Sequence, residues 1–146
     1  MPKDTEELQH ELSESDTIEQ FLSLNQENLR TFTLSEYLNY LLAEKRLSKS
    51  AVIEKSRLEH IYAYHIFAGR KKNSSKEKIL SLALAMELTP EEAQRLLYYA
   101  GAERLYVRNS WDSILWYALQ KHLTVDKANA LLEKMRVTPL LGRTGD

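Results

Sequence analysis

Apolar residues recur three and four positions apart along most of this chain, the spacing that places them on one face of an α-helix. The clearest stripe consists of Leu34, Tyr37, Leu38, Leu41 and Leu42. Gly and Pro are scarce, with four and three residues, and runs of β-branched residues are absent. The pattern therefore predicts an all-α fold.

Start and stop signals divide this pattern into separate helices. Three of the starts have the spacing of a capping box: Thr33 with Glu36, Ser74 with Glu77, and Thr89 with Glu92. Gly69 and Gly101 each follow a helical pattern and predict left-handed helix ends. The helices expected from these signals span about 34–46, 49–56, 60–67, 75–86, 90–100, 110–122 and 125–135.

The beginning of the chain differs from the rest because it is acidic and poor in apolar residues. Residues 1–16 have little surface to bury, so we expect them to be disordered. A short amphipathic helix over 17–29 is predicted by four apolar residues at helical spacing: Ile18, Phe21, Leu22 and Leu29. This helix either packs onto the domain that follows or forms a switchable arm.

An internal repeat extends the helical part. Residues 74–106 and 109–141 align at an offset of 35 with eleven identities, most of them apolar or small. Shared Leu and Ala periodicity is one explanation, but the common Leu-Thr at the hairpin turn favours a duplicated helical hairpin, stacked as a two-unit array. We expect an acidic arm at 1–32, a five-helix domain at 33–101, a helical hairpin at 102–141 and a disordered tail at 142–146.

Charge is distributed unevenly along the chain, although the formal total is only −1. Residues 1–32 carry −6, residues 33–72 carry +4 and residues 73–146 carry +1. The positive charge is therefore concentrated in the segment that contains the predicted helices at 34–46, 49–56 and 60–67. Such a segment suits a polyanionic partner.

Several classes of protein are disfavoured by the residues present. The chain has no Cys, which excludes disulfides and thiolate chemistry. No nucleophile-base pair, metal-ligand cluster or glycine-rich phosphate loop is recognisable, so we expect neither an enzyme nor a cofactor. His60 and His65 are five apart and would point in different directions on a helix, which disfavours a shared metal. The longest apolar run, 79–88, is half the length of a membrane span, and we expect a cytoplasmic protein with no membrane partner.

Two short helices joined by a tight turn, with longer helices before and after, form the layout of a helix-turn-helix domain. The stretch LSKSAVIEKSRLEHIYAYHIFAGRKKNSSKEKILSLALAMELTPEE has this layout and resembles the phage-repressor-like, or XRE-type, helix-turn-helix family over about 33–101. More loosely, residues 17–141 are similar to such regulators from Gram-positive bacteria that have a SLSEYLN first helix and a helical C-terminal extension. The resemblance implies a sequence-specific DNA-binding transcription regulator that acts on double-stranded DNA as a homodimer.

The same resemblance implies roles for individual positions. It places Val52, Leu58, Ala63 and Ile66 in buried sites between the two short helices. The candidate base readers are the exposed positions of the helix at 60–67 and the residue before it: Glu59, His60, Ile61, Tyr62, Tyr64 and His65. Phe67 is expected in the core, whereas Tyr64 either faces DNA or packs against the helix at 34–46.

Phosphate contacts are expected on both sides of this helix. Lys49 and Ser50 stand at the start of the helix at 49–56, and a helix N-terminus favours anions in any case. Three basic residues follow the stop at Gly69: Arg70, Lys71 and Lys72. Asn73 and Ser74 or Ser75 would add hydrogen bonds to phosphates. The alternative for this run is a solvated loop.

Three departures from the family pattern involve four positions. Ile53 stands where the family has a small residue, and Ala63 stands where it has a larger aliphatic, so a reciprocal exchange of volume is expected. Arg57 replaces a frequent turn Gly, and Glu59 replaces the usual Ser or Asp cap. Glu59 also brings a negative charge close to the expected phosphate surface.

These departures support a second hypothesis, a protein-protein interaction module that has lost DNA reading. Its partner would bind the N-terminal arm or the C-terminal hairpin. The C-terminal half of the chain is rich in aromatic residues, among them Trp111, Trp116 and Tyr117, with Tyr98 and Tyr99 in the earlier hairpin. Trp116 and Tyr117 replace the smaller Ser81 and Leu82 of the first repeat copy, as expected for an interface if they are exposed.

Overall fold

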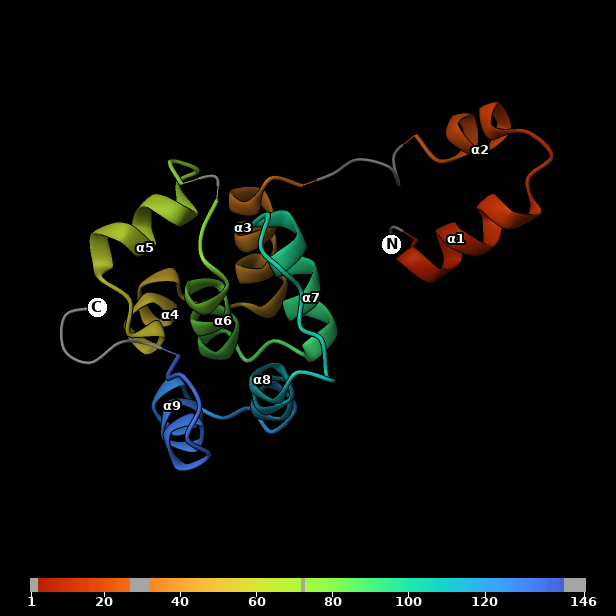
Figure 1. Ribbon diagram of the computed structural model, residues 1–146. Coiled ribbons are helices and arrows are strands. Elements are labelled where there is room, and N and C mark those ends of the chain that lie inside the picture. Colours follow the sequence, from red (N-terminus) through yellow and green to blue (C-terminus); the bar gives the residue numbers. More distant parts are fainter. Residues whose placement is uncertain (1–2, 27–31, 72, 141–146) are drawn as a thin grey trace. The chain divides into compact units, whose positions relative to one another are not determined.

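The computed structural model describes residues 3–26, 32–71 and 73–140 and divides into two units, Met1–Thr31 and Phe32–Asp146 (Figure 1). Every regular element within these ranges is a helix, so the all-α prediction is confirmed. The first unit contains α1 (Thr5–Glu14) and α2 (Ile18–Leu24). The second contains α3 (Leu34–Lys45), α4 (Lys49–Ser56), α5 (His60–Phe67), α6 (Lys76–Ala85), α7 (Pro90–Tyr99), α8 (Ser110–Gln120) and α9 (Val125–Lys134). None of these helices is long and apolar enough to cross a membrane.

The helix α1 forms where composition indicated disorder, so that prediction was wrong. Asp4 caps α1 by accepting a hydrogen bond from the backbone N–H of Glu7 at 2.8 Å. The buried Asn25 joins the two helices, since its amide donates to the Glu11 carboxylate at 2.9 Å and its oxygen accepts from Lys3 at 3.0 Å. Lys3 and Glu11 also form an ion pair. Polar contacts hold α1, and a prediction of disorder from low apolar content does not take such contacts into account.

The helix α2 matches the predicted amphipathic helix as far as Leu24. Phe21 is buried, whereas Ile18, Leu22 and Leu24 are exposed. Leu29, the last residue of the predicted stripe, lies outside the described residues. The first unit therefore presents a row of exposed apolar side chains on a short helix.

From α3 onward, the helices begin and end within two residues of their predicted bounds. Thr33 and Glu36 form a reciprocal capping box at the start of α3, and Thr89 forms the same arrangement with Glu92 at the start of α7. The two left-handed glycines that the sequence marked, at the ends of α5 and α7, have φ angles of 82° and 70°. Local capping chemistry thus fixes most of these boundaries.

One predicted cap is wrong. Ser74 does not cap α6, because the helix begins one residue later and Ser75 accepts the hydrogen bond from the backbone N–H of Lys78 at 3.3 Å. The hydroxyl of Ser74 instead accepts a hydrogen bond from the Tyr62 hydroxyl at 3.2 Å. A tertiary contact with α5 therefore occupies the side chain that the sequence assigned to a local cap.

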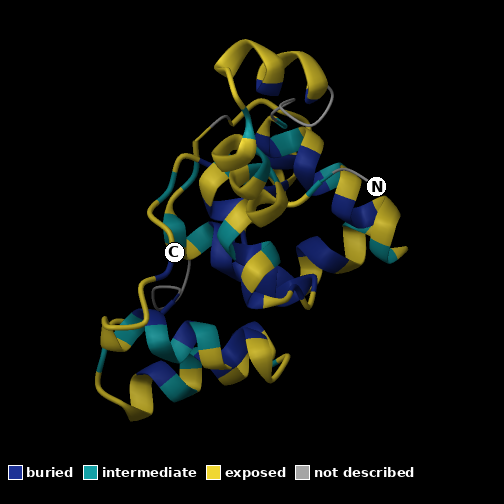
Figure 2. Ribbon diagram, turned by 90° about the vertical axis from the view of Figure 1, so that its right-hand side faces the viewer, coloured by how far each residue is buried: buried dark blue, intermediate teal, exposed yellow. Residues whose placement is uncertain are grey.

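The second unit is built around α6. Residues 79–85 of α6 are all buried, and this helix contacts α4, α7, α8 and α9. The helix α3 packs against both α5 and α7, which lie on opposite sides of it in Figure 1. Figure 2 shows the buried residues on the inner faces of the helices and the exposed residues along their outer faces. Burial of one central helix thus organises this unit.

The 35-residue repeat is visible in the backbone hydrogen bonds. At the end of α6, the N–H of Leu88 donates to the carbonyl of Ala83 at 3.0 Å, and at the end of α8, the N–H of Leu123 donates to the carbonyl of Ala118 at 3.0 Å. The residue before each of these leucines is left-handed, with φ angles of 54° and 53°. The two hairpins therefore have the same turn.

The same correspondence holds beyond the second helix of each hairpin. The Gln94 amide bonds to the backbone of Leu105 in both directions, at 2.9 and 2.7 Å. Thirty-five residues later, the Leu140 N–H donates to the Asn129 side chain at 2.6 Å. Since α8 and α9 pack together and against α6, the second hairpin stacks on the first as the repeat predicts.

A cluster of aromatic rings joins α3 to α7. The ring centroid of Tyr37 lies 4.9 Å from that of Tyr99, 5.7 Å from that of Phe32 and 6.1 Å from that of Tyr40. Burial raises the pKa of the Tyr37 hydroxyl to about 12, from an ordinary value of 10.0, although the neighbouring Arg95 opposes the rise. The folded chain therefore retains a proton that the unfolded chain releases at a lower pH.

We predict that Tyr37 makes the second unit less stable as the pH rises above about 10. The unfolded chain loses the Tyr37 proton first, so the free energy of unfolding falls until the folded form also ionises. The stability of the wild-type protein relative to Tyr37→Phe should therefore decline between about pH 10 and pH 12 in denaturant titrations. Tyr98→Phe, at an exposed tyrosine, is the control. A Tyr37→Phe difference that does not change with pH would contradict the prediction.

Candidate nucleic-acid interface

The helices α4 and α5 meet at a turn of three residues, Arg57 to Glu59. On their inner faces, five apolar side chains are buried: Val52, Ile53, Ala63, Ile66 and Phe67. Leu58, in the turn, is buried as well. The burial expected for Val52, Leu58, Ala63 and Ile66 is therefore confirmed. The side chains on the other side of α5 are left to face outward.

The start of α5 is fixed by Glu59. Its carboxylate accepts hydrogen bonds from the backbone N–H groups of Ile61 at 3.2 Å and Tyr62 at 2.6 Å. A negative charge at the positive end of a helix is stabilising, so Glu59 is an effective cap despite its unusual length. The cap also occupies two N–H groups that could otherwise bind a phosphate, so anion contacts near this end fall to side chains.

The turn before α5 requires a left-handed residue at position 57. Arg57 has a φ of 63°, which costs a residue other than Gly about 1 kcal/mol. Next to it, the hydroxyl of the buried Ser56 donates to the carbonyl of Ile53 at 2.6 Å and accepts from the N–H of Leu58 at 3.2 Å. The turn is thus tightly specified, and Arg57 adopts the left-handed conformation that Gly would suit.

The end of α5 is held by two side chains of α3. The Ser35 hydroxyl and the Asn39 amide both donate to the carbonyl of Phe67, at 2.6 and 3.0 Å. The chain then turns away at Gly69, where an added Cβ would lie 3.5 Å from the Cβ of Ser35. Side-chain hydrogen bonds therefore fix α5 at both of its ends.

The outer face of α5 carries the expected mixture of apolar and hydrogen-bonding groups. Ile61 is 65% exposed and Tyr64 is 44% exposed, so of the two alternatives for Tyr64 the outward one holds. His60 is exposed, with its Nε2 3.3 Å from the Glu54 carboxylate, and His65 is half-buried. These four side chains present donors, acceptors and an aliphatic surface within two turns of helix.

Tyr62 does not face outward as predicted. It is half-buried, its hydroxyl is bonded to Ser74, and the ammonium groups of Lys71 and Lys78 lie 5.5 and 4.3 Å from its ring centroid. The prediction failed because helical spacing does not show that the chain after α5 and the first turn of α6 return to this ring. Tyr62 instead holds two cations beside α5.

The expected phosphate-binding residues lie near the two ends of α5. Lys49, at the start of α4, has its ammonium group 5.7 Å from the centroid of the Phe67 ring. Ser50 is exposed, and its hydroxyl lies 3.1 Å from that of Ser48, the cap of α4. Arg70 and Lys71 are exposed after α5, whereas Lys72 lies outside the described residues.

Three lysine ammonium groups from separate segments therefore surround α5: Lys49 from α4, Lys71 from the segment after α5 and Lys78 from α6. Each contacts an aromatic ring of α5, an arrangement that holds a cation near the helix while leaving it able to meet an anion. Across the part of the chain that the structure describes, no cluster of three or more His, Asp or Glu side chains could hold a metal ion. The arrangement suits recognition of an extended anion.

Sequence reasoning missed three residues of this region, Ser35, Asn39 and Lys78, and gave Ser74 a different role. Ser35 and Asn39 hold the end of α5, Ser74 binds Tyr62, and Lys78 contacts the same ring. All four lie on or next to α3 and α6, outside the two short helices to which the pattern directs attention. The only available signal was their polar character on otherwise apolar helices, which does not identify a partner.

Comparisons of the chain with protein-family models, with curated proteins and with solved structures find no match. The function is therefore argued from the site itself.

We predict that the bonds from α3 to Phe67 set the stability of the end of α5. Ser35→Ala and Asn39→Ala should each lower the free energy of unfolding by about 1 kcal/mol, the usual value for one hydrogen bond. The double variant should also accelerate hydrogen exchange of the amides at the end of α5. Ser50→Ala, at an exposed serine, serves as the control. Unchanged exchange in the double variant would show that these bonds do not hold the helix.

Proposed function

We propose that the protein is a sequence-specific DNA-binding transcription regulator with a helix-turn-helix reading head, in which α5 enters the major groove. The observation that carries the proposal is the placement of Lys49, Lys71 and Lys78 around a helix that is fixed at both ends. Fixed cations beside an exposed helix supply the two parts of DNA recognition, which are backbone attraction and base contact. The resemblance to XRE-type regulators supports the same function.

In this proposal the phosphates are bound by groups around α5. Lys49 and Ser50 approach one phosphate at the start of α4, and Arg70 approaches another after the end of α5. Lys71 and Lys78 approach others beside Tyr62. Lys72, outside the described residues, would add to the contacts after the end of α5. Backbone contacts of this kind position the protein and make its affinity depend on salt.

Base edges are read by the outward side chains of α5. His60 and Tyr64 can donate to purine N7 or to base carbonyl oxygens, and Ile61 can contact a thymine methyl group. His65 reaches the edge of the groove. Tyr62 supports the lysines instead of reading bases. Glu59 remains compatible with DNA because its carboxylate is bonded to the first amides of α5.

We propose that the protein acts as a homodimer, because one short helix reads only a few base pairs and two half-sites extend the recognised sequence. In the C-terminal half of the chain, Tyr98, Tyr106 and Tyr117 are exposed, whereas Tyr99, Trp111 and Trp116 are half-buried. The indole N–H of Trp111 donates to the carbonyl of Thr138 at 2.8 Å. The bulk that the second repeat copy gained is thus exposed at Tyr117, which makes it a candidate contact between copies.

The second candidate function is a protein-interaction module. The observation that favours it is the pair of exposed apolar side chains Ile18 and Leu22, four residues apart on α2, in the acidic first unit. Exposed apolar residues at helical spacing suit docking into a groove of a partner protein. On this hypothesis the chain would bind neither random nor selected DNA.

We predict that DNA affinity depends on the lysines that surround α5. In fluorescence titrations with random duplex, the slope of the logarithm of affinity against that of salt concentration should become shallower by about one unit in Lys71→Ala and in Lys78→Ala. Lys134→Ala, at the far end of α9, should retain the wild-type slope. Undetectable binding at low salt, or equal slopes in all variants, would refute the DNA proposal.

We predict that Ile61 determines the preferred base at one position of each half-site. Selection from a random DNA pool should yield a palindrome for the wild-type protein, and Ile61→Ala should lose one conserved position while its affinity for the wild-type site falls by about 1 kcal/mol. Affinity for random duplex should not change. Val107→Ala, at an exposed aliphatic outside α5, is the control. An identical selected sequence for Ile61→Ala would exclude α5 as the reading helix.

A further inference from the structure

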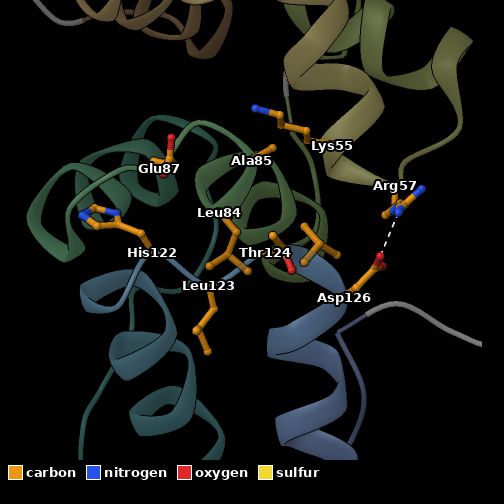
Figure 3. Close-up of a pocket in the computed structure, with 10 residues that line it drawn as sticks. Lys55, Arg57, Leu84, Ala85, Glu87, His122, Leu123, Thr124 and Asp126 are labelled. Carbon is orange, nitrogen blue, oxygen red and sulfur yellow. Dashed lines mark hydrogen bonds and ion pairs between the residues drawn. The ribbon is translucent and has the colours of Figure 1, made fainter.

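An ion pair links the C-terminal hairpin to the turn before α5. The guanidinium of Arg57 donates to the carboxylate of Asp126 at 2.8 Å, across 69 residues of sequence (Figure 3). This hydrogen bond raises the pKa of Arg57 above its ordinary value. Other polar contacts of the chain after residue 101 reach α6 and α7 instead of the turn before α5. Lys76 of α6 pairs with Asp112, and Gln94 of α7 binds the backbone of Leu105. The Arg57 contact reaches the turn that sets the direction of α5.

Arg57 occupies a sensitive place in that turn. Its backbone is left-handed, with a φ of 63°. The hydroxyl of Ser56 bonds to the backbone on both sides of Arg57, at Ile53 and at Leu58. Two residues after Arg57, Glu59 caps α5. A rotation of the backbone at this residue would change the direction in which α5 leaves the turn. A side-chain bond from Arg57 to another helix therefore restricts the reading helix as well as the arginine.

Asp126 is itself placed firmly. It lies in the first turn of α9, whose cap Thr124 accepts a hydrogen bond from the N–H of Lys127 at 3.1 Å. The turn that leads into α9 repeats the turn between α6 and α7. By position in the repeat, Asp126 corresponds to Glu91, which is exposed at the start of α7. The duplicated hairpin thus brings an acid of its second copy to Arg57.

A cavity of about 240 Å³ lies next to this pair. Leu84 and Ala85 of α6 line it together with Leu123 and Val125 of the second hairpin, and Lys55 and Arg57 lie on the α4 side (Figure 3). Asp126 lines the same cavity, so both partners of the ion pair border it. The ion pair links the α4 side of the cavity to α9 by a direct polar contact.

We propose that Asp126 is a positioning residue for DNA reading, acting through Arg57 to hold the turn that directs α5. This inference rests on the proposed function and extends it, since it makes the C-terminal hairpin part of the reading head. It also accounts for an arginine at a position that would suit Gly, because Gly could not form the link to α9. Asp126 is not itself expected to touch DNA.

Removal of the Asp126 carboxylate should raise the affinity for DNA through its charge and lower it through loss of positioning. These opposite effects make the proposal testable. Asp126→Asn removes a negative charge, and by electrostatics alone this should strengthen binding to DNA. Loss of positioning should instead weaken binding to the selected site. Glu91→Gln removes the same charge from the equivalent place in the first repeat copy and is the matched control.

The experiment measures affinity of the full chain for its selected duplex and for random duplex at about 0.15 M salt. Asp126→Asn should weaken selected-site binding about threefold, as suits an exposed ion pair, and should not weaken binding to random duplex. Asp126→Glu should restore most of the affinity, and Glu91→Gln should not lower it. Equal affinities for Asp126→Asn and Glu91→Gln would overturn the proposal.

A double-variant cycle tests whether Asp126 acts through Arg57. Arg57→Gln should weaken selected-site binding as well, and Asp126→Asn should add nothing in that background. Independent, additive losses would overturn the proposed route.

Hydrogen exchange without DNA separates this inference from the proposed function. Asp126→Asn should accelerate exchange of the amides of Ile61 and Tyr62, whereas Glu91→Gln should not. If the wild-type protein bound no DNA, the proposed function would fail, and the positioning role in DNA reading would fail with it. If DNA binding were normal and exchange in both variants matched the wild type, the positioning role alone would fail.

Discussion

The arrangement of the second unit depends on the burial of α6 beyond its first turn. Its residues from Ile79 to Met86 are buried, and it contacts helices that come before and after it in the chain. A helix that is apolar on every side has to be surrounded, and α4, α7, α8 and α9 surround this one. The position of α4 then fixes where the turn and α5 can lie, so the outward face of α5 is a consequence of packing around α6.

The short connections between these helices impose a second constraint. Within residues 3–26, 32–71 and 73–140, five residues other than Gly have positive φ angles, and they are all charged or His: Arg46, Arg57, Glu87, His122 and Arg136. Each follows the end of a helix, where a left-handed residue lets the chain reverse within a few residues. Long polar side chains at such positions point to solvent or form a contact, as Arg57 does with Asp126. Two of these turns, at Glu87 and His122, are equivalent in the repeat, as a duplicated hairpin predicts.

The sequence predicted the helices well because their boundaries are encoded locally. Capping residues such as Thr33 and Thr89 satisfy their own helix, so a window of a few residues contains the required information. The stripe of apolar residues on α3 and the buried positions of α4 and α5 follow from periodicity in the same way. The helix α1 could not be predicted on this basis because it is held by polar contacts around Asn25.

The candidate site was only partly predictable, since contacts distant in sequence define it. Helical spacing placed Ile61 and Tyr64 outward correctly, but it could not show that Lys78 and Ser74 return to Tyr62. Nor could it show that two side chains of α3 hold the carbonyl of Phe67. Those contacts depend on how α3 and α6 pack, which no local window contains.

The three departures from the resembled family can now be considered together. Ile53 and Ala63 are both fully buried on helices that contact each other, which is consistent with a reciprocal exchange of volume. Glu59 satisfies the first amides of α5, and Arg57 adopts the left-handed turn while bonding to Asp126. Each departure is therefore matched by a specific partner within the chain. These contacts together fix the direction of α5 within the second unit.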